Sequence, residues 1–195
     1  MTATAVDGEL VASSGNSAVL DEIRYPGVLL AIWLRAAPVS LSLADAGSFE
    51  AISFECPPAA VGTFLLAALE PTGHAAWHDA IAADAAQLAI RLAATIYVDQ
   101  VEVRLEPVST DGCWKFHSDY VTARLLTTYF GPGTQWTRAD EEHAILRQLN
   151  TGDVAVFKGR VVDPDAGILH RSPPISQTGD RRILLVIGPT RTIMP

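Results

Sequence analysis

The feature that most constrains the fold is a series of short β segments in the second half of the chain, each closed by Gly or Pro. Residues 101–106 alternate apolar and polar side chains with a period of two and end at Pro107, which predicts a half-exposed strand. Residues 124–130 are rich in β-forming residues and stop at Gly131. Three further short strands are expected at residues 154–157, 167–170 and 182–188. Short strands broken in this way favour a sandwich or a barrel.

The first half of the chain predicts helices and one buried strand. Residues 27–34 are apolar on both faces, as in a strand that is covered on both sides. Pro57 and Pro58 open a second apolar segment, and proline is favourable at a helix start. The clearest helix spans about residues 75–96, where large apolar side chains form one stripe: Trp77, Ile81, Leu88, Leu92 and Ile96.

These patterns together predict one α+β domain. Residues 1–18 are small and polar and are expected to form a flexible leader, so the domain itself would cover residues 19–195. Within it, helical support is expected over about residues 57–97 and a β core over about residues 98–190. A chain of 195 residues is large enough to bury a core without disulfides.

Charge and cysteine content exclude several classes of function. The formal net charge is -8 and the basic residues form no cluster, which argues against nucleic acid or an anionic membrane as a partner. Cys56 and Cys113 are the two cysteines, too few for a disulfide framework or a zinc ribbon. The sequence shows neither a signal peptide nor an apolar stretch of about 20 residues, so we expect a cytoplasmic protein.

A candidate metal site lies in the β-rich half. His117 and Asp119 form an H-x-D motif, and residues two apart on a strand point to the same side. The motif alone is weak, because five histidines and 22 acidic residues make a chance match about an even bet. The residues that follow the motif strengthen it, because they include a third potential ligand. This is His170, which follows a turn and the strand expected at residues 154–157. Two histidines and one carboxylate leave three positions of an iron(II) ion open, as in non-haem oxygenases.

An arginine that follows His170 is a candidate for binding a carboxylate. Two open metal positions can take a 2-oxo acid and its carboxylate, and the third can take dioxygen. The far carboxylate of 2-oxoglutarate is then best bound by an arginine fork. Arg181 and Arg182 both precede the apolar run 183–187. Both faces of this run are apolar, so the pattern does not show which of the two arginines points into the pocket.

The order H-x-D, G-D-V-x-x-F strand, distal His and Arg resembles the 2-oxoglutarate/Fe(II) dioxygenase superfamily. Three blocks are more particular and resemble a bacterial domain family whose genes often lie beside zinc-homeostasis functions: residues 116–120 (FHSDY), 129–136 (YFGPGTQW) and 170–174 (HRSPP). The resemblance covers about residues 95–190. It implies a double-stranded β-helix (jelly roll, cupin-like) with flanking helices from the N-terminal half, and a site in the mouth of the β-helix.

The same resemblance implies roles for individual residues. His117, Asp119 and His170 become the metal ligands, and Arg182 becomes the clamp for 2-oxoglutarate because related proteins place arginine directly before the apolar run. Other residues are candidates from their positions: Arg124, Thr128 and Tyr129 to line the same pocket, and Trp114 and Trp136 either to wall the substrate pocket or to pack in the core. The implied function is oxidation of a small molecule or a protein side chain, with iron(II), 2-oxoglutarate and O2.

Two other functions remain open at this point. The same three ligands plus one water satisfy a tetrahedral zinc site, so a non-catalytic metal-binding protein of zinc homeostasis is an alternative. A cupin-like enzyme that uses the metal without 2-oxoglutarate is another. The organic substrate cannot be read from the sequence, and the helical half is a candidate lid or homodimer surface.

Overall fold

The computed structural model describes residues 4–5, 10–73, 75–140 and 145–190. Its strands and helices follow in chain order: β1 (Thr4–Ala5), β2 (Val11–Ser14), the 3-10 helix η2 (Ser17–Arg24), β3 (Leu30–Trp33), η3 (Asp45–Gly47), β4 (Ile52–Cys56), η4 (Pro58–Ala60), α1 (Val61–Leu69), η5 (Glu70–Thr72), α2 (Ala76–Ile96), β5 (Val101–Val108), β6 (Ala123–Phe130), β7 (Gln135–Arg138), β8 (Arg147–Gln148), β9 (Val154–Lys158), β10 (Ile168–Arg171) and β11 (Arg182–Pro189).

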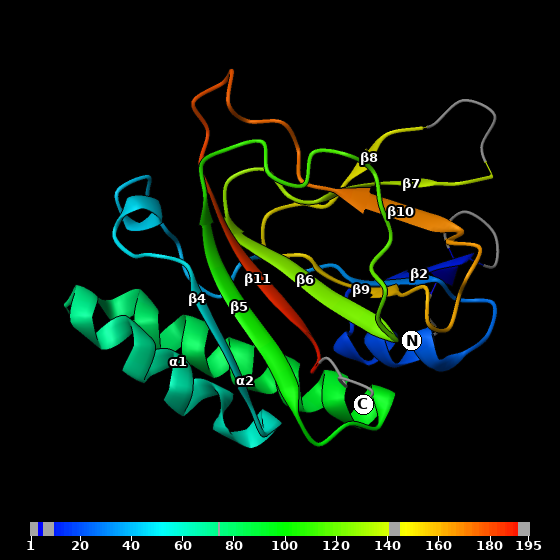
Figure 1. Ribbon diagram of the computed structural model, residues 1–195, viewed down its shortest axis with the longest axis horizontal. Coiled ribbons are helices and arrows are strands. Elements are labelled where there is room, and N and C mark those ends of the chain that lie inside the picture. The colour runs from blue at the N-terminus through cyan, green and yellow to red at the C-terminus, as the bar shows by residue number, and fades with distance from the viewer. Residues whose placement is uncertain (1–3, 6–9, 74, 141–144, 191–195) are drawn as a thin grey trace, which may run out of the picture.

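The strands of the described ranges form two sheets. The larger has eight strands in the order β1-β2-β3-β9-β6-β11-β5-β4, and the smaller has three in the order β10-β7-β8. Pairing in the larger sheet is antiparallel except between β2 and β3. Figure 1 shows α1 and α2 on one side of the larger sheet and the smaller sheet on the other side.

One hydrophobic core lies between the larger sheet and the helices. Ile81, Leu88 and Leu92 of α2 are buried there against apolar residues of the central strands β6, β9 and β11. Full burial of each of these side chains stabilises the fold by about 1.5–3 kcal/mol. The apolar stripe predicted for residues 75–96 is therefore the surface by which α2 covers the sheet.

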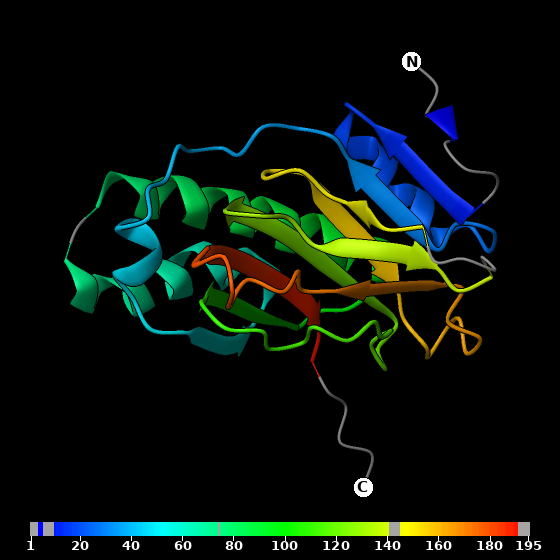
Figure 2. The same ribbon diagram turned by 90° about the horizontal axis from the view of Figure 1, so that it is seen from above.

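A second hydrophobic core lies between the two sheets. Leu126, Phe157 and Leu184 of the larger sheet are buried there together with Trp136 and Ile168 of the smaller sheet. Side chains alternate between the two faces of a strand. Each central strand therefore contributes to both cores, and Figure 2 shows the helices and the smaller sheet on opposite sides of these strands.

The structure confirms the α+β class and the predicted helix over residues 75–96, which is α2. The strands expected at 101–106, 124–130, 154–157, 167–170 and 182–188 correspond to β5, β6, β9, β10 and β11. None of the helices in the described ranges has both the length and the apolar character that a membrane crossing requires.

The N-terminal segment differs from the expected flexible leader. Residues 1–3 and 6–9 lie outside the described residues, but Val11–Ser14 form β2, and η2 begins at Ser17. Asn16 caps η2 by accepting a hydrogen bond from the N–H of Ala18 (2.9 Å). Although small and polar, residues 11–14 form a strand because they pair with the buried strand β3, and Val11 lies in the second core.

Candidate metal centre

His117, Asp119 and His170 converge on one point between the two sheets. One ligand atom from each of the three residues lies within 4.8 Å of the others, and the described residues contain no other such group. His170 belongs to β10, and His117 forms an isolated antiparallel bridge with it. The N–H of His117 donates to the carbonyl of His170 (3.0 Å), and the N–H of His170 donates to the carbonyl of His117 (2.9 Å). Backbone pairing thus brings together two histidines that are 53 residues apart in sequence.

The hydrogen bond of the His117 ring prepares it to bind a metal. Its Nδ1 lies 2.9 Å from the carbonyl oxygen of Lys115. A carbonyl can only accept, so Nδ1 carries the proton and Nε2 keeps its lone pair. A histidine that ligates a metal commonly donates its other N–H to a carbonyl in this way.

His170 is almost fully buried, with its ring against that of Phe157 at 4.5 Å between centroids. Burial lowers the pKa of His170, while its hydrogen bond to Asp119 and the charge of Asp119 act in the opposite direction. Nδ1 of His170 is buried without a hydrogen-bond partner among the described residues. Burial thus favours the uncharged ring, which is the form that a metal ligand requires.

Asp119 is held as a carboxylate. Burial alone would raise its pKa, but the hydrogen bond and charge of His170, followed by the charges of Arg124 and His117, lower the pKa well below its usual range. Its Oδ2 lies 3.5 Å from Nε2 of His170 and 3.3 Å from Nε of Arg124. Two nitrogen ligands and one ionised oxygen ligand fit a divalent ion of iron or zinc.

Arg124 joins the site to the larger sheet. Its Nη1 lies 3.3 Å from Oε2 of Glu102 on β5. The guanidinium passes over Gly188 of β11, where a Cβ would lie 2.7 Å from Nη1. The absence of a side chain at residue 188 therefore lets Arg124 reach both carboxylates.

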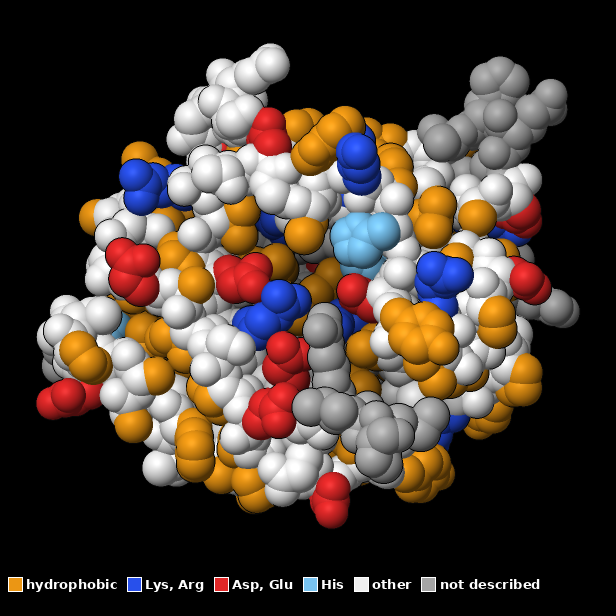
Figure 3. Space-filling view, in the orientation of Figure 1, with side chains coloured by type: hydrophobic (Ala, Val, Ile, Leu, Met, Phe, Trp, Pro, Cys, Tyr) orange, Lys and Arg blue, Asp and Glu red, His pale blue; other side chains and the backbone are white. Residues whose placement is uncertain are grey.

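A cavity of about 480 Å³ opens beside the three ligands. On the face drawn in Figure 3, acidic, basic and histidine side chains surround a hollow with apolar side chains inside it. Glu102, Arg104 and Glu106 of β5 line this cavity, together with Leu184 and Val186 of β11. These three charged residues were not among the predicted pocket residues, although their alternation with buried Val and Leu could have indicated that they share one face.

Arg182 is buried at the start of β11, on the same face of that strand as Leu184. Its Nε donates to the carbonyl of Pro132 (2.6 Å), and its Nη1 donates to Oγ of Ser172 (2.8 Å). Its Nη2 donates to the hydroxyls of Thr128 (3.2 Å) and Thr134 (3.3 Å). Ser172 and Thr134 also line the cavity, so the guanidinium lies directly behind the cavity wall.

Among the described residues, Arg182 forms no ion pair. Burial lowers the pKa of Arg182 to about 10, with the charge of Glu106 acting in the opposite direction, so the group stays charged at neutral pH. Buried charges are normally paired, whereas the hydrogen bonds of this guanidinium within the described residues all go to uncharged acceptors.

Arg181 has a different environment. It is exposed, and its Nη1 approaches Gly47, where a Cβ would lie 2.6 Å away. The turn that follows β6 packs against the backbone of these two arginines. Gly131 in this turn has a φ of +79°, and a Cβ there would lie 2.0 Å from the carbonyl oxygen of Arg181. This contact explains the first glycine of the G-P-G block and brings the Pro132 carbonyl to Arg182.

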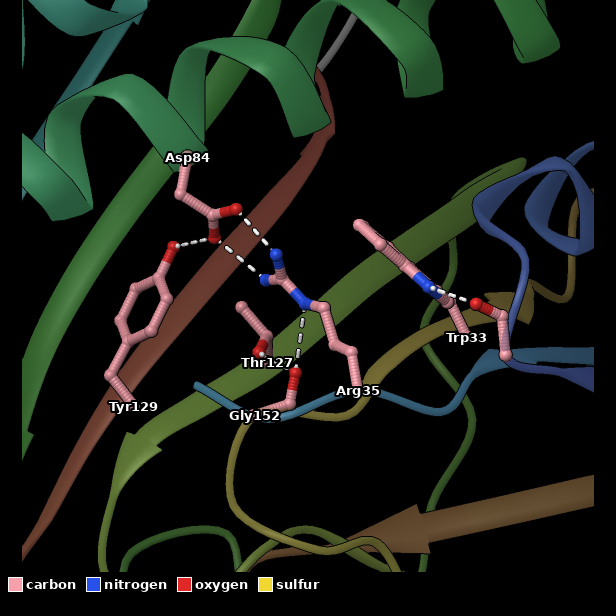
Figure 4. Close-up of polar contacts among 7 residues, drawn as sticks. Trp33, Arg35, Asp84, Thr127, Tyr129 and Gly152 are labelled. Atoms are coloured by element: carbon pink, nitrogen blue, oxygen red, sulfur yellow. Dashed lines mark hydrogen bonds and ion pairs between the residues drawn. The ribbon is translucent and has the colours of Figure 1, made fainter. Parts of the chain in front are cut away.

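Three other predicted pocket residues lie outside the cavity wall. Tyr129 is on the helix face of β6, because it is one residue away from Thr128, and its hydroxyl donates to Asp84 of α2 (2.8 Å; Figure 4). Trp136 packs in the second hydrophobic core, and Trp114 is half-exposed. Neither tryptophan lines the cavity, whereas Arg124 does. Thr128 does not line it either, but its hydroxyl accepts a hydrogen bond from Arg182 behind the cavity wall.

Comparison with protein families identifies the chain. The model of the family DUF1826, described as a protein of unknown function, matches residues 14–188. The chain belongs to the DUF1826 family. No protein of curated function matches the sequence of this DUF1826 domain.

Solved structures that resemble the DUF1826 domain include two dioxygenases and an epoxidase. The rice dioxygenase for auxin oxidation has a TM-score of 0.43 at 13% identity, over 72% of this chain and 57% of its own. The Arabidopsis thaliana dioxygenase for auxin oxidation 1, in a complex with 2-oxoglutarate, has a TM-score of 0.39 at 12% identity, over 82% and 70%. The hydroxypropylphosphonic acid epoxidase of S. wedmorenis has a TM-score of 0.33 at 19% identity, over 45% and 42%. The DUF1826 domain thus spans little more than half of the rice protein, and at these TM-scores the similarities assign no function to it.

Proposed function

We propose that this DUF1826 domain is a non-haem iron(II)- and 2-oxoglutarate-dependent oxygenase with a jelly-roll core. The observation that carries the proposal is the pairing of two features at one cavity. His117, Asp119 and His170 present three ligand atoms for a metal, and the buried guanidinium of Arg182 lies behind the wall of the same cavity without an ion pair to any described carboxylate. A site that only bound zinc would not require a buried guanidinium whose hydrogen bonds within the described residues all go to uncharged acceptors.

Each group of residues would have its own role in this reaction. His117, Asp119 and His170 would hold iron(II), which with 2-oxoglutarate supplies the activation of dioxygen. Arg182, with Thr128 and Thr134 beside it, would bind the far carboxylate of the cosubstrate through a charge-assisted pair of hydrogen bonds. The rest of the cavity, lined by Glu102, Arg104 and Glu106, would take a small molecule or a protein side chain.

The cosubstrate is tested by titrating the protein anaerobically with iron(II) and then with 2-oxoglutarate. We expect a weak visible charge-transfer band, and succinate should form when air is admitted. Arg182→Met should weaken 2-oxoglutarate binding at least about 100-fold, because a bidentate charged pair contributes about 3 kcal/mol or more. Arg181→Met is the matched control, since this neighbouring arginine is exposed and points away from the cavity.

The metal serves as the check on folding in this experiment. Arg182→Met should still bind one equivalent of iron(II), because Arg182 does not contact the three ligands. If the wild-type protein binds metal but shows neither the band nor succinate, 2-oxoglutarate is not its cosubstrate. Tight zinc binding that is indifferent to Arg182→Met, without any oxygen-dependent product, would favour the non-catalytic alternative.

A further inference from the structure

A second cavity, of about 410 Å³, lies on the helix side of the larger sheet, away from the candidate metal centre. It opens between the ends of η2 and α2 and the first residues of β6. Ile23, Pro26, Leu29 and Ile96 give it a largely apolar wall. Three charged residues also line it, Arg24, Lys158 and Asp163, and of these Lys158, at the end of β9, is almost fully buried.

The Lys158 ammonium has polar partners in the described part of the chain. Burial lowers the pKa of Lys158, and the charge of Asp163 acts in the opposite direction. Nζ of Lys158 donates to the carbonyls of Tyr25 (2.7 Å) and Pro26 (3.5 Å). Within the described residues no carboxylate forms an ion pair with it. Asp163 lines the same cavity, but its Oδ2 accepts the N–H of Gly167 (2.9 Å). An ammonium that is buried and unpaired is costly unless an anion compensates it.

A second polar group in the cavity is also left without a partner. Oγ1 of Thr122 is buried, and no described residue makes a hydrogen bond with it. Buried hydroxyls are normally hydrogen-bonded, so this atom is a candidate donor to a ligand. Thr122 and Lys158 therefore offer two hydrogen-bond donors at one apolar cavity.

We propose that this cavity binds a small organic monocarboxylate. The carboxylate would accept from Lys158 and Thr122, and an aliphatic or aromatic body would lie against Ile23, Leu29 and Ile96. Charge limits the ligand to a single negative group: Lys158 and Arg24 at the cavity are opposed by Asp163, which leaves one net positive charge. A second carboxylate would give the occupied cavity a net negative charge.

The cavity is connected by backbone hydrogen bonds to the loop that carries Asp119. The N–H of Gly159 donates to the carbonyl of Thr122 (3.0 Å), and the N–H of Arg160 donates to the carbonyl of Asp119 (2.9 Å). A Cβ on Gly159 would lie 2.0 Å from the carbonyl oxygen of Val121, so the two segments are in close contact. A ligand on Lys158 and Thr122 would therefore touch both sides of this contact, and its binding should be coupled to that of a metal at Asp119.

The proposal is tested by a two-dimensional 1H–15N NMR titration of the full chain with hexanoate, and with hexanamide as the neutral probe of the same shape. We expect saturable shifts with hexanoate at Thr122, Ala123 and Lys158, and at least about tenfold weaker binding of hexanamide. This readout depends on neither metal nor catalysis, so it stands apart from the proposed function.

Variants identify the groups that bind the probe. Lys158→Met should weaken hexanoate binding at least about tenfold, and Thr122→Val should weaken it several-fold. Lys115→Met is the matched control, because Lys115 is the other lysine of the chain and is exposed. The proposal is overturned if hexanoate gives no saturable shifts, if hexanamide binds equally well, or if Lys158→Met binds hexanoate like the wild type. Should Lys158→Met fail to fold, Thr122→Val and the amide comparison still decide the question.

Discussion

An ion pair between the larger sheet and α2 allows a quantitative prediction about stability. The guanidinium of Arg35, which follows β3, donates to both oxygens of Asp84 on α2, at 2.5 Å and 2.7 Å (Figure 4). The hydroxyl of Tyr129 donates to the same carboxylate (2.8 Å), and Nε of Arg35 donates to the carbonyl of Gly152 (3.0 Å). The side chains of Arg35 and Asp84 are only 13% and 8% exposed, so water can replace little of what either one loses.

Replacing Arg35 by Met should destabilise the protein by about 3–5 kcal/mol, because the Asp84 carboxylate stays buried with Tyr129 as its remaining side-chain donor. Tyr129→Phe should cost about 1.5–3 kcal/mol, the contribution of one hydrogen bond to a charged group. The double variant Arg35→Met/Asp84→Asn should be more stable than Arg35→Met alone. Its buried amide carries no charge and can still accept from Tyr129.

Urea unfolding followed by circular dichroism measures these differences. For a chain of this size, about 1 kcal/mol corresponds to roughly 2–4 °C in Tm, so Arg35→Met should melt roughly 6–20 °C lower. Arg91→Met is the matched control on the same helix, because the Arg91–Asp21 pair is about one third exposed and should contribute less than about 1 kcal/mol. The reasoning is refuted if Arg35→Met costs no more than Arg91→Met, or if the added Asp84→Asn recovers nothing.

Three further predictions concern the site and the turn beside β9. Adding iron(II) at about 100 times its Kd should stabilise the protein by about 2.7 kcal/mol, and a chelator should reverse this in a thermal melt, whereas Asp119→Ala should show no shift. Arg124→Met should weaken metal binding about 10- to 100-fold in a competition titration without unfolding the protein, because Arg124 holds Asp119 in place; unchanged affinity would contradict that role. Gly152→Ala should cost at least about 2 kcal/mol in urea unfolding, since its φ is +97° and a Cβ would lie 2.2 Å from the backbone N of Ala37. Gly179→Ala, with a φ of +73° and nothing within 4 Å of its Cβ, is the control and should cost only about 1 kcal/mol.

Local patterns were enough to predict most of the elements. The stripe of α2 and the alternation of β5 depend on a period of 3.6 or 2, which residues close in sequence display by themselves. The H-x-D motif and His170 could be singled out because their residue types suit a metal. The face of Tyr129 could also have been predicted, since Thr128 and Tyr129 are adjacent on a strand and must point in opposite directions.

Other features depend on contacts between distant parts of the chain. Residues 11–14 have the composition of a leader, and only pairing with β3 makes them a strand. The apolar run after Arg182 is buried on both faces, so its own pattern does not reveal which face borders the cavity. Packing of β11 between two hydrophobic cores decided that Arg182 is buried at the cavity and that Arg181 is exposed.

The sequence by itself thus determined the class of fold, the position of α2 and of the central strands, and the three candidate ligands. The tertiary structure decided which charges are buried without an ion pair among the described residues. Burial of Arg182 beside the metal cavity and of Lys158 beside the second cavity results from several segments closing around each side chain. The pattern of a single segment cannot predict this burial, because it depends on how the segments pack together in the folded protein.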